Sequence, residues 1–135
     1  MTRRPIVSRV PETAEQAHIV QLTRTLGGTA YVLGTTRRRG DYAGTMQTPG
    51  VPDLLLFLPR RDGGREFVAW EVKAAGGRLR PDQARFAGEC QAAAVAHGVG
   101  GFDAFIAFLV ARGVASWGSF AHQHRPATVL PAEVR

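Results

Sequence analysis

Hydrophobic positions recur with two different periods along the chain, and the change of period predicts the order of its helices and strands. Apolar residues in 12–26 return every three or four positions, which is typical of a helix with one buried face. Residues 29–36 form a short run rich in β-branched residues and predict a strand. Residues 53–58 are almost continuously apolar, which predicts a strand buried on both faces. Residues 66–73 follow a glycine-containing turn, so these two segments predict an antiparallel hairpin.

The second half of the chain predicts one more helix and one more strand. Pro81 suits the first turn of a helix, and apolar residues behind it indicate a helix that runs to about His97. The apolar segment 102–110 predicts a fourth strand. The order helix, three strands, helix, strand indicates an α/β fold, a small mixed sheet flanked by helices. We expect residues 1–11 to be a basic flexible arm, 12–125 a single domain and 126–135 a C-terminal tail.

Size, cysteine content and charge narrow the class of protein. The 135 residues correspond to one domain, and no apolar run approaches the ~20 residues that a membrane-spanning helix needs. A single cysteine, Cys90, excludes an internal disulfide and an all-cysteine zinc site, which favours a reducing, cytoplasmic setting in a bacterial or phage-infected cell. The net charge of +6 indicates a polyanionic partner, usually nucleic acid, although a basic surface can also serve solubility alone.

Lys73 is the only lysine among 17 basic residues, and the other 16 are arginines. Arginine is a broad planar fork that stays charged, whereas lysine is a compact ammonium that enters tight sites. Its place in an apolar strand, two residues after Glu71, makes Lys73 a candidate for chemistry.

One acidic residue on each arm of the predicted hairpin completes a candidate site. Glu71 and Lys73 share a face because they are two residues apart on a strand, and Asp53 begins the strand beside them. Two carboxylates, with the carbonyl of Val72 as a further ligand, suit a hard divalent cation such as Mg²⁺. Such a cation supports phosphodiester hydrolysis. The alternative is an edge salt bridge between Glu71 and Lys73, with Asp53 an ordinary turn residue.

Three stretches together resemble the VRR-NUC family of the PD-(D/E)XK nuclease superfamily. They are Gly50-Val51-Pro52-Asp53-Leu54, Glu71-Val72-Lys73 and Gly77-Arg78-Leu79-Arg80-Pro81-Asp82-Gln83. The resemblance extends over residues 12–108 and implies a restriction-endonuclease-like core.

The resemblance also implies roles for individual residues. Asp53 and Glu71 would be metal ligands, Lys73 the catalytic lysine and Gln83 a supporting glutamine at the start of the second helix. Gln83 in a first helical turn can also simply cap backbone groups. Family members carry a further metal-directed glutamate on the first helix, for which Glu12 and Glu15 are candidates. We favour Glu15, because it continues the apolar stripe of that helix toward the core.

Arginines on both sides of the candidate site suggest how a nucleic acid would be held. Arg37, Arg38 and Arg39 precede Asp53, and Arg78, Arg80 and Arg85 flank Gln83, so both groups could contact phosphates. We expect a Mg²⁺-dependent DNA endonuclease, with Mn²⁺ able to substitute. Stand-alone members of the family are similar to Holliday-junction resolvases, which implies branched DNA as substrate and a homodimer with two sites. The alternatives are a nicking or double-strand endonuclease of phage or restriction type, or a non-catalytic nucleic-acid-binding module. The need for a helper protein is left open.

Overall fold

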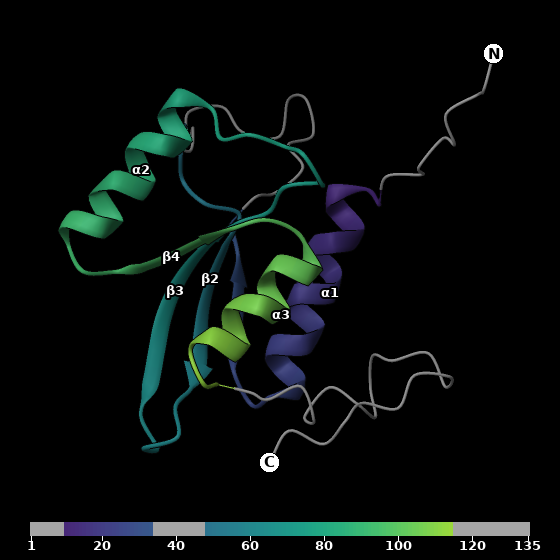
Figure 1. The fold of residues 1–135 in the computed structure, drawn as a ribbon, viewed down its shortest axis with the longest axis vertical. Helices are drawn as coiled ribbons and strands as arrows, with labels where there is room; N and C mark the ends of the chain where they lie inside the picture. The colour runs from purple at the N-terminus through teal and green to yellow at the C-terminus, as the bar shows by residue number, and fades with distance from the viewer. Residues whose placement is uncertain (1–9, 34–47, 115–135) are drawn as a thin grey trace, which may run out of the picture.

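A computed structural model describes residues 10–33 and 48–114, which form a mixed sheet flanked by helices (Figure 1). The elements are α1 (Glu12–Thr25), β1 (Thr29–Val32), β2 (Leu54–Pro59), β3 (Arg65–Glu71), α2 (Pro81–Ala92), β4 (Ala96–Val99) and α3 (Phe102–Ala111). The strand order is β1-β2-β3-β4, with the first two pairings antiparallel and the third parallel. The predicted α/β class is therefore confirmed. The expected flexible arm lies almost wholly outside the described residues, and the expected C-terminal tail lies entirely outside them.

Helix α1 begins and ends where the sequence predicts. Pro11 is extended and precedes the first turn, in which the acidic Glu12 and Glu15 complement the positive end of the helix dipole. The chain leaves the helix at Gly27, whose φ of 87° favours glycine. Ile19 and Leu22 are fully buried, so the apolar stripe of α1 faces the core.

Strands β2 and β3 form the predicted hairpin, with Leu54 opposite Trp70 and Pro59 opposite Arg65. The prediction that β2 is buried on both faces is wrong. Leu54, Leu56 and Leu58 are fully buried, whereas the residues between them are only partly covered. The reason lies in the arrangement of the helices: α1 and α3 pack side by side against one face, whereas α2 lies against β4 and leaves the opposite face of β2 partly open (Figure 1).

Two boundaries in the second half of the chain also differ from prediction. Helix α2 ends at Ala92 rather than near His97, and residues 96–99 are strand β4. Ala94, with a φ of 56°, makes the break, a conformation that an alanine-rich sequence does not signal. Residues 102–111 form α3 instead of the predicted fourth strand. A short, wholly apolar run has no clear period, so it fits a buried helix as well as a strand.

The core lies between the sheet and the α1–α3 pair. Its largest buried side chains are Trp70 and Phe105, whose rings meet edge to face with centroids 5.1 Å apart. Leu109 of α3 and Leu22 of α1 close the same layer. Among the described residues, no helix has the length and hydrophobicity to cross a bilayer.

Candidate active site

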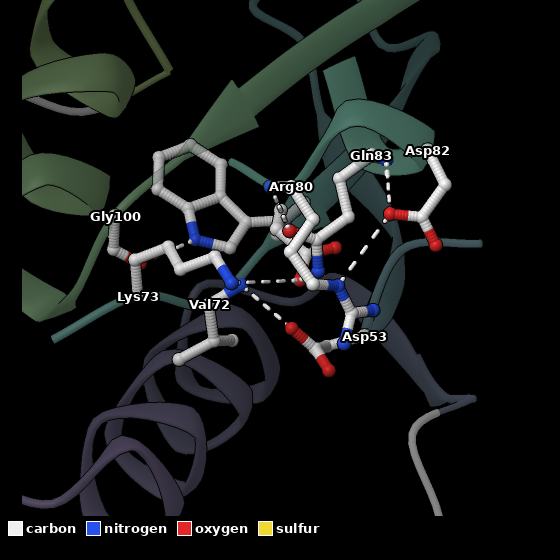
Figure 2. A network of polar contacts seen from close by, with 9 residues as sticks. Asp53, Val72, Lys73, Arg80, Asp82, Gln83 and Gly100 are labelled. Atoms are coloured by element: carbon white, nitrogen blue, oxygen red, sulfur yellow. Dashed lines mark hydrogen bonds and ion pairs between the residues drawn. The ribbon is translucent and has the colours of Figure 1, made fainter. Parts of the chain in front are cut away.

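The ends of β2 and β3 bring together the two acids that the sequence singles out. Asp53 precedes the first residue of β2, and Glu71 is the last residue of β3. The Asp53 carboxylate accepts a hydrogen bond of 2.8 Å from the backbone N–H of Val72, which ties the start of one strand to the end of the other (Figure 2). The expected juxtaposition of Asp53 with Glu71 is therefore present in the fold.

Glu71 is buried at this sheet end, with only 5% of its side chain exposed. Gln83 Nε2 donates a hydrogen bond of 2.7 Å to Glu71 Oε1, and Lys73 Nζ lies 3.9 Å from the same oxygen. Desolvation by burial raises the pKa of Glu71 to about 8, and the neighbouring charge and hydrogen bond of Asp53 act in the same direction. The Lys73 and Arg80 cations oppose this rise but do not cancel it. A cation placed beside Glu71 would therefore stabilise its ionised form.

Lys73 follows β3 and is itself largely buried, with 15% of its side chain exposed. Its backbone N–H donates to the Gly100 carbonyl over 3.3 Å, which fixes the chain just after the strand. The side chain also lines a cavity of about 280 Å³ between the 74–77 loop and the start of α3. Lys73 therefore borders both Glu71 and an open space large enough for part of a ligand.

Gln83 makes two contacts, one with the backbone at the start of α2 and one with Glu71. Its Oε1 accepts the N–H of Arg80 at 2.9 Å, so it caps α2 as the second half of a capping box. Its amide nitrogen simultaneously donates to Glu71. The backbone before Asp53 rests on the same helix start, because a Cβ at Gly50 would lie 2.6 Å from the carbonyl oxygen of Asp82. The first turn of α2 thus orients the site from one side.

The structure distinguishes the two first-helix glutamates. Glu12 is exposed, whereas Glu15 is partly buried and shares the 280 Å³ cavity with Lys73. The Glu15 Oε2 accepts a hydrogen bond of 2.7 Å from the backbone N–H of Phe102, at the start of α3. Within the described part of the chain, no three histidine, cysteine or acidic side chains form a group able to hold a metal, so Glu15 is not gathered with Asp53 and Glu71.

Three of the arginines predicted to contact phosphate lie just before α2 or in its first half. Arg78, Arg80 and Arg85 are all exposed, and Arg80 Nε lies 3.5 Å from Asp82 (Figure 2). Arg37, Arg38 and Arg39 lie outside the described residues.

The sequence does not predict the role of the turn between β4 and α3, residues 99–102. The backbone of this turn contacts Glu71 and Lys73. Its Gly100 N–H donates to the carbonyl of Glu71 over 2.9 Å, and the Gly100 carbonyl accepts from Lys73. The pair Gly100-Gly101 is typical of a turn, but nothing local in the sequence indicates which part of the fold this turn contacts.

The donor groups at this site fit a divalent cation. Two neighbouring carboxylates, one of them buried with a raised pKa, repel each other when both are ionised. A cation bound between them would offset that repulsion. Val72 follows Glu71 in the chain. Among the described residues, its carbonyl oxygen accepts no hydrogen bond. A set of one or two carboxylates with a carbonyl, completed by water, is the environment that Mg²⁺ prefers.

Comparison with known proteins agrees with this geometry. The family model described as "VRR-NUC domain" matches residues 3–106. A solved structure of a VRR_NUC domain is similar at 26% sequence identity with a TM-score of 0.55, and the alignment covers 73% of this chain and 92% of that one. No curated protein sequence matches the chain. The matched family model covers most of the chain and includes Asp53, Glu71, Lys73 and Gln83. This protein therefore belongs to the VRR-NUC family and carries a nuclease-type domain.

Proposed function

We propose that this protein is a metal-dependent endonuclease that hydrolyses DNA phosphodiester bonds at the end of the β2–β3 hairpin. The observation that carries the proposal is the burial of Glu71 between Asp53, Lys73 and the Gln83 amide. Burying an acid whose pKa rises to about 8 is unfavourable unless a cation compensates it. A salt bridge that serves stability alone gives no reason to bury Glu71. An exposed pair already stabilises by ~0–1 kcal/mol, and burying the charges adds a desolvation cost.

Each residue of the site has a distinct role in this proposal. Asp53, Glu71 and the carbonyl of Val72 would hold a divalent cation, with Mg²⁺ the physiological ion and Mn²⁺ able to replace it. When bound, such an ion polarises a phosphoryl oxygen and lowers the pKa of a water molecule. Lys73 orients the attacking water and balances the negative charge on the phosphoryl oxygens in the transition state. Gln83 holds the Glu71 carboxylate in place, and Glu15 faces the same cavity as Lys73.

The positive charge of the chain supports DNA as the substrate. Exposed Arg78, Arg80 and Arg85 lie around the start of α2, where they contact phosphates on either side of the cleaved bond. We propose that Arg37, Arg38 and Arg39 contact phosphates in the same way. Backbone contacts of this kind recognise shape rather than base sequence, which favours branched DNA such as a Holliday junction. A homodimer would supply the two active sites that paired incisions require.

The test is a comparison of three labelled DNA substrates: a four-way junction, a flap and a linear duplex. Each is incubated with Mg²⁺, with Mn²⁺ and with EDTA. We expect metal-dependent cleavage, faster on the junction than on the duplex. Equal rates on all three substrates would keep the endonuclease and contradict junction selectivity. Tight binding without any cleavage would favour a binding module.

A plasmid with an extruded cruciform tests the homodimer independently. Two coordinated incisions convert the supercoiled plasmid directly to the linear form. A single active site releases the nicked circle first and linearises it only later. We expect the linear product without accumulation of the nicked form, and accumulation of nicked circles would contradict the dimer.

A further inference from the structure

The side chain of Trp70 connects the core of the protein to the backbone of the candidate site. Trp70 precedes Glu71 on β3 and is 1% exposed. Its indole N–H donates a hydrogen bond of 3.0 Å to the carbonyl of Gly100. The indole N–H of a buried tryptophan usually donates a hydrogen bond. The choice of partner matters here, because Gly100 also contacts two residues of the candidate site.

Gly100 makes two backbone hydrogen bonds with the candidate site, one as donor and one as acceptor. Its N–H donates to the Glu71 carbonyl over 2.9 Å, and its carbonyl accepts from the Lys73 N–H over 3.3 Å. The Gly100 carbonyl is therefore shared between the Trp70 indole and the Lys73 backbone. A shift of this carbonyl would change the spacing between the Glu71 carboxylate and the Lys73 ammonium.

The backbone of the 99–102 turn holds this position only because glycines occupy it. Gly100 has a φ of 138°, a conformation that side chains rarely adopt. A Cβ at Gly101 would lie 2.7 Å from the carboxyl carbon of Glu15, so this turn also contacts the first-helix acid. The next residue, Phe102, donates its N–H to the same carboxylate. One turn thus contacts Glu71, Lys73 and Glu15.

The ring of Trp70 is itself held in one orientation. A Cβ at Gly98 would overlap the benzene ring of the indole, so the ring packs directly against the backbone of β4. On its other sides Phe105 and Phe108 of α3 meet it edge to face, with centroid distances of 5.1 and 5.4 Å. The indole N–H therefore has a fixed direction, and Gly100 lies in that direction.

We propose that Trp70 is a positioning residue for phosphodiester cleavage, which acts through the Gly100 carbonyl to set the relative placement of Glu71 and Lys73. This inference rests on the proposed nuclease function. Trp70 touches neither substrate nor cation in this scheme. Its contribution is geometric, because a misplacement of about 1 Å in an active site can lower the rate by roughly 100-fold.

The most specific variant is replacement of Trp70 by benzothienylalanine, an isostere that keeps the bicyclic ring and lacks the N–H. Trp70→Phe is the simpler companion, which also loses ring volume. The matched control is Leu58→Ala, a fully buried core change at the opposite end of β2. Leu58→Ala lowers stability because it removes buried core volume, and it does so without touching residues 99–102. All proteins are compared at a temperature at which circular dichroism shows them folded.

We expect the two Trp70 variants to lower kcat for DNA cleavage by roughly 10- to 100-fold with KM little changed, and to bind Mn²⁺ more weakly in calorimetry. Leu58→Ala should keep both values. Unchanged kcat in the folded isostere would overturn the proposal. If the wild-type protein binds Mn²⁺ but cleaves no DNA, the proposed function fails on its own. The Mn²⁺ affinity of the isostere then decides the role of Trp70, and an unchanged affinity would refute it.

Discussion

At the scale of single residues, Glu71 determines how the site responds to pH. The group holds its proton in the folded protein up to a pKa of about 8, whereas an ordinary glutamate releases it near 4.5. Between these two values the folded state binds a proton that the unfolded state has lost. In the absence of metal, this group's contribution to the free energy of unfolding is therefore largest at and below pH 4.5 and falls as pH rises toward about 8.

This dependence is measurable by urea unfolding in EDTA at a series of pH values. We expect the wild-type protein to lose stability across that interval relative to Glu71→Gln, in which residue 71 no longer titrates. Gln83 can still donate to the amide oxygen of the variant, so the packing is retained. Parallel stability profiles for the two proteins would show that Glu71 is not strongly desolvated. Mn²⁺ should bind more tightly as pH rises through the same range, because it requires the carboxylate.

Lys73 is the second residue whose chemical type we expect to matter. Lys73→Arg should lower cleavage by roughly 100-fold or more, because the planar guanidinium does not fit where the compact ammonium stands 3.9 Å from Glu71. Arg24→Lys, on the exposed side of α1, is the matched control and should leave the rate unchanged. The readout is single-turnover cleavage of labelled DNA. Full activity of Lys73→Arg would remove the argument that the only lysine of the chain was retained for catalysis.

At the scale of elements, the start of α2 combines a helix cap with support of the site. We expect Gln83→Ala to destabilise the protein by about 1–3 kcal/mol, because it leaves the buried Glu71 without its hydrogen-bond donor. The variant should also cleave DNA more slowly. Gln91→Ala, which removes an exposed glutamine from the same helix, is the control and should change neither property. Equal effects of the two substitutions in urea unfolding and cleavage would contradict the supporting role of Gln83.

Sequence patterns predicted the elements best where the period was clear. Helix α1 with its buried Ile19 and Leu22, and the β2–β3 hairpin, were expected with bounds close to those observed. Helix α3 was predicted as a strand, because a uniformly apolar segment carries no period that distinguishes the two. Strand β4 was not predicted, and the expected helix overlaps its first two residues. Its formation depends on pairing with β3 and on the close approach of Gly98 to Trp70.

The site was predictable to the extent that it depends on local spacing. Asp53, Glu71 and Lys73 lie at the two joined ends of one hairpin, so their proximity follows from the turn between the strands. The contact of Glu15 with Phe102 joins residues far apart in sequence. No local pattern signals such a contact, and the role of the 99–102 turn was missed for the same reason. Arg37, Arg38 and Arg39 stay a prediction.

At the scale of the whole molecule, the net charge of +6 leads us to expect that DNA binding weakens as salt concentration rises. Release of counterions from DNA makes the logarithm of the binding constant fall linearly with the logarithm of salt concentration. We expect a steep dependence in fluorescence anisotropy with Ca²⁺ in place of Mg²⁺. Substitution of Arg37, Arg38 and Arg39 by glutamine should reduce the slope by about 1 for each phosphate contact that is lost.

The control for this measurement is another triple substitution of arginine by glutamine, at the end of the sheet away from the candidate site. Arg60, Arg61 and Arg65 lie at the tip of the β2–β3 hairpin, far from Asp53 along the strand. Their substitution by glutamine should leave the salt dependence nearly unchanged. Equal effects of the two triple substitutions would indicate a general attraction to DNA rather than a phosphate-binding loop beside the site.

The whole molecule is proposed to act through one metal-dependent centre, and cleavage by Glu71→Gln tests that claim most directly. Labelled junction DNA is incubated with wild-type protein and with the variant, in Mg²⁺, in EDTA, and after Mg²⁺ is restored in excess. We predict cleavage by the wild-type protein that EDTA stops and Mg²⁺ restores, and no cleavage by a variant that still folds and binds the junction. Cleavage that persists in EDTA, or a variant as active as the wild-type protein, would contradict a metal-dependent active site at Asp53, Glu71 and Lys73.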